Sequence, residues 1–316
     1  GQKSGDKEDS SETTVSGDPR RAQAYDADFH LPKDASDGDR RQALAAWITD
    51  RRNPLLARVM VNRLWQTHFG VGFVETPSDF GFNGGRPSHP ELLDWLAAEL
   101  MDHGWSLKHI HRLIVTSATY RQSSRPRVEA AKKDAGNRLL WRKSPQRLDA
   151  ETVRDAVLAV SGELNPAVGG PGYHDFTTFI FNSQFYDIVD PVGQSFSRRS
   201  LYRTWVRSGR NPFLEVFDCP DPSTKTPRRA VTTTPLQALS LLNNSFMLRM
   251  SERLAERVKR EAGEDVASQM RRAGLLIYGR SPTNEDVAAW REFVAAHGLP
   301  ALARVLFNSN EFLYVD

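Results

Sequence analysis

Residues 53–124 read NPLLARVMVNRLWQTHFGVGFVETPSDFGFNGGRPSHPELLDWLAAELMDHGWSLKHIHRLIVTSATYRQSS, and this stretch decides the fold class. Its apolar residues recur at helical spacing between clear start and stop signals, which predicts three helices. Asn53 is expected to cap the first helix, with Pro54 at its first position and Gly70 as its stop. The helices also carry more His, Arg, Asn, Asp and Trp than an ordinary structural helix pair requires.

The second and third helices of this stretch have their own boundary signals. Ser88 and Glu91 have the spacing of a capping box, and Gly104 is the expected stop of the helix that they begin. Ser106 is expected to cap the next helix. The residues expected to face inward are Leu92, Leu93, Trp95, Leu96 and Leu100 in the former and Leu107, Ile110, Leu113 and Ile114 in the latter.

The rest of the chain is also predicted to be largely helical. Leu148 and Val153 are expected to form a hydrophobic staple around Asp149 as N-cap, and Thr234-Pro235 begins another helix. Further helices are predicted at about 39–49, 246–260, 265–278, 285–297 and 301–308.

The middle of the chain has a different composition. The segments TTFIFN (177–182), SLYRTWVR (200–207) and FLEVFD (213–218) are rich in β-branched and aromatic residues, which predicts short strands. We therefore expect a mainly α fold, with two helical lobes at about 36–164 and 230–316 and a small antiparallel β insert at about 173–217. Residues 1–35 are polar and are predicted to be a disordered linker or part of an upstream region.

Composition excludes several classes of protein. The 316 residues include 42 basic and 39 acidic side chains, a balance that does not favour nucleic-acid binding. No apolar run is long enough for a membrane span. The single cysteine, Cys219, excludes an internal disulfide, a four-cysteine zinc site and a C-x-x-C-H haem site in this chain.

Several long motifs carry a family resemblance: NPLLARVMVNRLWQTHFG, TPSDFG, PSHPELLDWLA, HGWSLKHIHRLI, TYRQSS, RLDAETVRDAVLAVSG, RRSLY, FDCPDP, TTTPLQALSLLNN and LFNSNEFLYVD. Over about residues 38–316 the chain closely resembles the planctomycete-type family called domain of unknown function 1553 (DUF1553). The resemblance implies a C-terminal domain of a large exported protein, with a sister domain and a cytochrome-c-like domain upstream. Haem is then expected only on that associated domain, and the setting periplasmic or secreted. No signal peptide begins the chain, so the targeting segment is expected upstream. The resemblance also suggests a link to electron transfer or polysaccharide breakdown.

One group of candidate site residues lies in the 53–124 stretch. Asn62, Arg63, Trp65 and His68 share one helix and form either a polar pocket wall with an aromatic platform or a helix bonded to neighbouring loops. Asp79 lies in a glycine-rich polar loop that either holds a site or only makes turns. His89, in the first turn of its helix, is a candidate general base or a capping residue.

Histidines cluster at His103, His109 and His111. Metal ligation from one helix uses i, i+3 or i, i+4 spacing. His109 and His111 are two residues apart and diverge by about 200° on a helix, so no metal site is expected from them.

A second group of candidates is charged. Arg147 and Asp149 begin a cluster with Glu151, Arg154 and Asp155 that serves acid–base chemistry or a network of ion pairs. A Pro-rich loop then carries further candidates that bind a ligand or lock the loop in place, and its lone cysteine is expected to be inert. The loop candidates are Asp218, Asp221, Arg228 and Arg229.

The predicted β insert is rich in aromatic residues and arginines. If its aromatic residues are exposed, they are expected to stack on sugar rings. If they are buried, they form the core of the sheet, which is the more common outcome. These residues are Tyr173, Phe176, Phe179, Phe181, Phe185, Tyr186, Tyr202 and Trp205. On a strand, Arg199, Arg203 and Arg207 would share one face as a basic stripe.

Two functions remain open from the sequence. The first is an accessory or binding module that contacts a partner domain or a polysaccharide through residues 218–229 and the helix of Asn62. The alternative is a carbohydrate-active hydrolase or oxidoreductase that uses Asp79, Asp149 or Asp218. The enzyme requires two of these carboxylates, or one with His68 or His89, in a common cleft, whereas the accessory module predicts that they pair with arginines and caps.

Overall fold

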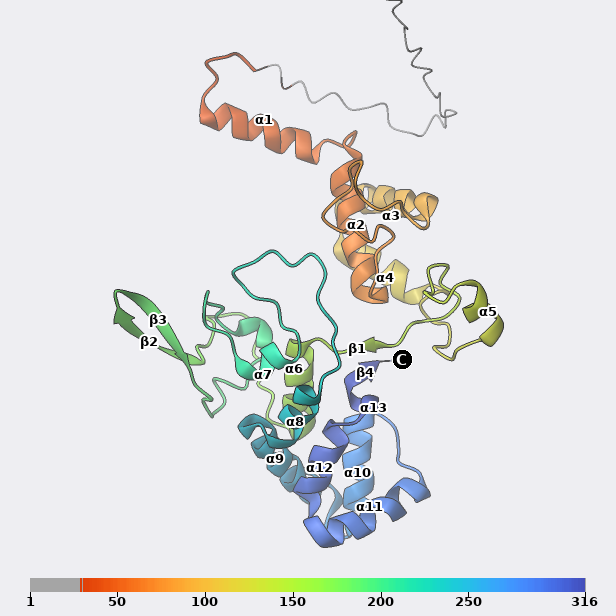
Figure 1. Cartoon of the computed structure of the whole chain (residues 1–316), viewed down its shortest axis with the longest axis vertical. Coiled ribbons are helices and arrows are strands. Elements are labelled where there is room, and N and C mark those ends of the chain that lie inside the picture. The colour runs from red at the N-terminus through yellow and green to blue at the C-terminus, as the bar shows by residue number, and fades with distance from the viewer. Residues whose placement is uncertain (1–28, 30, 316) are drawn as a thin grey trace, which may run out of the picture. The chain divides into compact units, whose positions relative to one another are not determined.

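The computed structural model describes Phe29 and residues 31–315, so most of the predicted linker lies outside the described residues. The described residues divide into two compact units between Ser117 and Ala118, and each unit is described separately. The division falls after Ser117, well before the lobe boundary expected near residue 164. The fold is mainly α, as predicted, with two short two-stranded antiparallel sheets among the described residues (Figure 1).

The described part of the first unit contains four helices: α1 (Asp37–Thr49), α2 (Pro54–Phe69), α3 (Pro90–Asp102) and α4 (Leu107–Thr116). Helices α2, α3 and α4 pack against one another around Val61, Leu100 and Ile110, which are fully buried. Helix α1 begins with a capping box at Ser36 and Asp39, but none of its described residues is buried.

The predicted boundaries of α2 and α4 are confirmed. The Asn53 side chain accepts a hydrogen bond from the backbone N–H of Leu55, and Gly70 ends α2 in the left-handed conformation with φ of 80°. Ser106 Oγ accepts from the backbone N–H of His109, 3.3 Å away, at the start of α4.

The predicted capping box at α3 is wrong. The N-cap of α3 is His89, and its side chain makes no capping hydrogen bond. Because Pro90 occupies the first helical position, Ser88 lies two residues before the helix begins, and its Oγ is 2.9 Å from Nδ1 of the N-cap His89. Trp95, expected to face inward, is 49% exposed.

The second unit is built on one apolar core. Its helices are α5 (Val128–Lys133), α6 (Ala150–Ser161), α7 (Pro212–Val216), α8 (Pro235–Asn243), α9 (Ser245–Ala262), α10 (Val266–Tyr278), α11 (Asn284–His297), α12 (Leu299–Phe307) and α13 (Asn310–Leu313). Helix α9 packs against α6, α10 and α12, which brings Val157, Leu254 and Leu302 together in the core (Figure 1). Helix α6 therefore belongs with the C-terminal helices, which explains why the units divide upstream of it.

The expected N-caps of this unit differ in whether the side chain makes a capping hydrogen bond. Thr234 and Thr283 form capping boxes with Gln237 and Asp286. Asp149 is the N-cap of α6, but its side chain makes no capping hydrogen bond among the described residues.

The two sheets join different parts of the second unit. Strand β1 (Gln146–Arg147) pairs with β4 (Tyr314–Val315), so the start of α6 is tied to the C-terminal segment. Strands β2 (Phe176–Phe181) and β3 (Ser183–Ile188) form a hairpin in which Phe176 faces Ile188 and Phe181 faces Ser183.

Two of the three predicted strands are wrong. The segment 200–207 contains the 3₁₀ helix η1 (Ser200–Tyr202), and 213–218 lies mostly in α7. Asn211 Oδ1 accepts from the backbone N–H groups of Phe213 and Leu214, so an Asn-Pro start makes α7 a helix. Phe213 and Phe217, four residues apart, then lie on one buried face.

No described helix has both the length and the apolar character needed to cross a bilayer. This agrees with the expectation from the sequence.

Candidate functional site

The candidate residues of α2 are largely used inside the first unit. Asn62 is fully buried, and its side-chain amide donates to the carbonyl oxygen of Val74 and accepts from its backbone N–H. Trp65 is 5% exposed and lies between the rings of Phe69 and Phe73, each 4.2 Å away by centroid. The helix therefore holds the loop after it by buried hydrogen bonds and stacking, while Arg63 is exposed.

The other candidates of the first unit lie apart in small local arrangements. His68 Nε2 and His111 Nδ1 are 2.7 Å apart, and one of them donates a hydrogen bond to the other. Asp79 Oδ1 accepts from the backbone N–H of Gly81, and its carbonyl accepts from Thr76 Oγ1, which is a loop-forming role. His89 interacts with Ser88, as described above.

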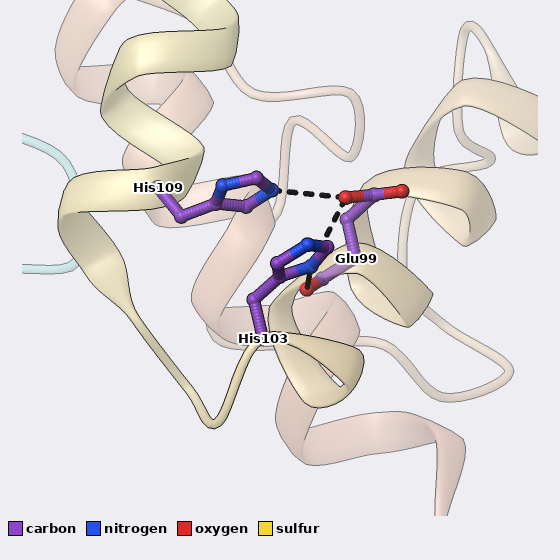
Figure 2. A group of neighbouring side chains, drawn as sticks. All are labelled: Glu99, His103 and His109. Carbon is purple, nitrogen blue, oxygen red and sulfur yellow. Dashed lines mark hydrogen bonds and ion pairs between the residues drawn. The ribbon is translucent and has the colours of Figure 1, made fainter.

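The first unit also contains a cluster that the sequence reasoning missed: Glu99, His103 and His109. One ligand atom from each residue lies within 4.8 Å of the other two (Figure 2). Oε2 of Glu99 is 2.9 Å from Nε2 of His109 and 3.2 Å from Nδ1 of His103. The two imidazole rings are stacked, with centroids 3.8 Å apart.

The fold explains how this cluster forms. Glu99 and His103 are four residues apart at the end of α3, and Ser106 begins α4 so that His109 faces them. His109 and His111 point to different partners, Glu99 and His68. The sequence does contain a signal for this cluster, the four-residue spacing of Glu99 and His103. A search for pairs of histidines alone does not detect it.

In the second unit, Arg147 and Asp218 form a buried ion pair. Their Nη2 and Oδ2 atoms are 2.6 Å apart, and only 4% and 14% of the two side chains are exposed. Asp218 also accepts from the backbone N–H and the hydroxyl of Thr232. Burial alone would raise the pKa of Asp218, but the hydrogen bonds from Thr232 and Arg147 outweigh it and lower the pKa.

The remaining charged candidates are also paired or exposed. Arg229 donates two hydrogen bonds to Glu151 and lies 3.9 Å from Asp149. Asp221 pairs with Arg210 at the surface, and Arg228 is exposed.

Cys219 lies close to the Glu151–Arg229 pair. Burial, followed by the negative charge of Glu151, raises the pKa of the Cys219 thiol to about 12. The thiol is therefore protonated at neutral pH and is a poor nucleophile.

The predicted arginine stripe does not exist. Arg203 is buried and donates from Nε to Oδ2 of Asp175 at 2.7 Å, whereas 59% of the Arg199 side chain is exposed. These arginines flank a 3₁₀ helix rather than sharing a strand face, so the β insert presents no basic row at these positions.

An open cleft of about 710 Å³ lies in the second unit, a volume typical of ligand sites, which span roughly 300–1,000 Å³. It is lined by α6, α9 and the segments around the β2–β3 hairpin, and the lining residues that bear on its chemistry are Arg154, Tyr173, Asp175, Asp190, Phe246 and Arg249. None of the described lining residues is Asp149, Asp218, Asp221 or Arg229.

Two polar atoms in the wall of the cleft are unsatisfied. Tyr173 is 7% exposed and Asp175 is 4% exposed. The Tyr173 hydroxyl and Oδ1 of Asp175 find no hydrogen-bond partner among the described residues, although Oδ2 of Asp175 accepts from Arg203 and Asn211. Buried polar atoms normally have partners, so the lack of a partner for these two atoms requires an explanation.

A family model described as a protein of unknown function (DUF1553), named PSD1, matches residues 40–294. The chain belongs to the DUF1553 family. Neither the curated proteins nor the solved structures contain a match.

The aromatic residues of this DUF1553 chain are divided between two environments. Tyr173 is buried beside the cleft, whereas Phe179, Phe181 and Phe185 on the hairpin are 45%, 73% and 40% exposed. The hairpin therefore does not form a sheet core, contrary to the more common outcome for such residues. A two-stranded hairpin covers only part of its own aromatic surface, which leaves the rings of Phe179 and Phe185 stacked on each other in solvent.

Proposed function

We propose that this DUF1553 domain is a binding module for a polysaccharide, acting in an exported, cytochrome-linked multidomain protein. The observation that carries the proposal is the cleft with its two unsatisfied polar atoms, the Tyr173 hydroxyl and Oδ1 of Asp175. A sugar hydroxyl both donates and accepts hydrogen bonds, so hydroxyls of a sugar have the chemistry to accept from a phenol and to donate to a carboxylate oxygen.

The apolar part of the cleft suits the same ligand. Phe196 and Phe246 line it beside Tyr173, and the face of a sugar ring packs on aromatic side chains while its hydroxyls reach polar groups. Arg154 lies 5.4 Å from the Tyr173 ring centroid and 5.7 Å from that of Phe246, which holds these aromatic residues against the cleft wall. The mixture of aromatic residues and fixed polar groups supports a carbohydrate over a purely apolar ligand.

The charged residues support binding rather than acid–base catalysis. Asp190 accepts two hydrogen bonds from Arg249, and these bonds lower the pKa of the Asp190 carboxyl. A carboxylate held ionised in this way has no proton to donate at neutral pH, and its lowered pKa also makes it a weak base. Asp218 and Glu151 are similarly paired with arginines away from the cleft, as an accessory module predicts. We therefore place the binding site in the cleft rather than in the 218–229 segment or on α2.

The cellular setting is proposed from the family. We expect the domain to work outside the cytoplasm next to a cytochrome-c-like domain, and haem to be carried by that domain. The test is purification of the protein from its native cells under mild conditions. Soret absorbance that co-elutes with the chain supports the proposal, and a chain isolated from the cytoplasm without associated haem contradicts it.

The ligand is tested by isothermal titration against neutral hexasaccharides with β-1,4 and α-1,4 linkages and an acidic oligogalacturonate. Saturable binding of a neutral oligosaccharide without release of shorter products supports the binding module. Binding followed by new reducing ends or oxidised products supports the alternative enzyme. If no member of the panel binds, polysaccharide recognition by this cleft is wrong.

A further inference from the structure

We propose that Glu99, His103 and His109 bind a divalent transition-metal ion of the zinc type. The three residues come from α3, its C-cap and α4, and one ligand atom from each lies within 4.8 Å of the others (Figure 2). The site is independent of the cleft, because every residue that lines the cleft lies in the second unit.

The donor set fits such an ion. Two imidazole nitrogens and one carboxylate oxygen are ligands that Zn²⁺ prefers, and they form the three-ligand set of many open zinc sites. A hard ion such as Mg²⁺ or Ca²⁺ takes oxygen ligands instead, so two histidines disfavour it. Three protein ligands leave a coordination position for water.

The distances fit as well. Zinc–ligand bonds of ~2.0–2.1 Å in a tetrahedral site put neighbouring ligand atoms ~3.3 Å apart. Oε2 of Glu99 is 2.9 Å from Nε2 of His109, and one ligand atom from each of the three residues lies within 4.8 Å of the other two. Only a small shift is therefore needed between Glu99 and His109, whereas His103 must move further.

A hydrogen bond of His103 determines which of its ring nitrogens is available to a metal ion. Nδ1 of His103 lies 3.0 Å from the backbone carbonyl oxygen of Glu99, so Nδ1 carries the proton and donates it to this carbonyl. Metal-binding histidines commonly donate one N–H to a carbonyl or carboxylate, which leaves the other nitrogen as the ligand. Nε2 of His103 is then the ligand atom.

The accessibility of the cluster allows the ion to enter and His103 to adjust. About half of the His103 side chain is exposed, whereas His109 and Glu99 are 27% and 26% exposed. The rings of the two histidines are nearly parallel, at 15°, so their lone pairs do not yet converge on one point. Rotation of the exposed His103 ring opens the stack and closes the site around the ion.

The test is a titration of the complete chain, freed of metal by chelator and dialysis, with ZnCl₂. We expect one Zn²⁺ per chain and a rise in melting temperature on binding. Glu99→Gln, His103→Asn and His109→Asn should each weaken Zn²⁺ binding at least about 10-fold. His297→Asn is the matched control and should leave binding unchanged, because His297 lies in the other unit, with its ring tilted against that of Phe293.

Cobalt gives a second readout. Co²⁺ in a site of low coordination number has intense visible absorption, which the wild-type chain should show and His103→Asn should lose. Because His103 is exposed, this variant is expected to fold even if His109→Asn does not. The proposal is overturned if the wild-type chain binds no Zn²⁺, or if His103→Asn with Glu99→Gln binds it like the wild type. Oligosaccharide binding, in the other unit, succeeds or fails separately.

Discussion

The guanidinium of Arg147 and the carboxylate of Asp218 lie 2.6 Å apart in the second unit, and 4% and 14% of their side chains are exposed. Arg147 belongs to β1, which pairs with the C-terminal strand β4, whereas Asp218 follows α7 in the left-handed conformation with φ of 64°. The ion pair therefore ties the start of α6 to the loop after α7. Both residues were candidates for a ligand site, and from their burial and pairing we expect a structural role.

Loss of Asp218 should destabilise the second unit. Asp218→Ala leaves the Arg147 charge buried and unpaired, which is expected to lower the free energy of unfolding by about 3 kcal/mol. Denaturant unfolding measures this change. Asp221→Ala, which breaks a surface pair with Arg210, is the matched control and should have a much smaller effect. Equal effects of the two substitutions would contradict the assignment of Asp218 as a structural residue.

The free energy of unfolding should also depend on pH through the ionisation of Asp218. Burial would raise the pKa of this carboxyl, but Thr232 and Arg147 outweigh it and the pKa is lower in the folded chain than in the unfolded chain. Its contribution is then complete above the ordinary Asp pKa of about 3.9 and is lost as the pH falls through the lower folded-state value. Unfolding curves of the wild type and Asp218→Asn should therefore converge as the pH falls below about 4. A stability difference that stays constant down to pH ~2 would show that Asp218 is not the titrating group.

Cys219 should react slowly in the folded chain. With a pKa of about 12, its thiolate fraction at pH 8 is on the order of 10³-fold below that of an unperturbed cysteine, whose pKa is ~8.5. Alkylation by iodoacetamide, followed by mass spectrometry, measures this difference against the chain in denaturant. Similar rates in the two states would mean that burial and Glu151 do not protect the thiol.

Two serines of the first unit provide a comparison of helix caps. Ser106→Ala removes the hydroxyl that accepts from the His109 N–H and should cost about 1 kcal/mol. Ser88→Ala should cost clearly less, since Ser88 lies outside α3 and caps nothing there. Thermal unfolding of the two variants distinguishes them, and a larger loss in Ser88→Ala would support the capping box expected from the sequence.

The sequence predicted those elements whose signals are local. Asn53-Pro54, Gly70 and Thr234-Pro235 mark helix ends through their own side chains and backbone angles, and the structure confirms all three. The segment 213–218 was wrongly predicted as a strand because its aromatic residues favour strands, whereas the Asn211 cap makes it a helix. At this segment a short-range capping hydrogen bond outweighs the strand propensity of the aromatic residues.

The candidate sites were harder to predict because they depend on tertiary packing. Arg147 and Asp218 were both candidates, but their pairing across 71 positions is a tertiary contact that the sequence does not indicate. The interpretation of the cleft depends on the burial of Tyr173 and Asp175. No local sequence pattern predicts how deeply these side chains are buried. Glu99 and His103 were the exception, since their spacing along α3 was readable and only the position of His109 required the fold.

The most direct test of the proposed function is the affinity of Tyr173→Phe for the oligosaccharide that the wild type binds. The substitution removes a buried hydroxyl with no partner among the described residues, so stability should stay the same or rise. If the hydroxyl bonds the ligand, the dissociation constant should rise by roughly 5–10-fold, since one hydrogen bond contributes about 1 kcal/mol. Tyr186→Phe, on the hairpin outside the cleft, should bind like the wild type. Unchanged affinity in Tyr173→Phe, or an equal loss in both variants, would contradict binding in this cleft.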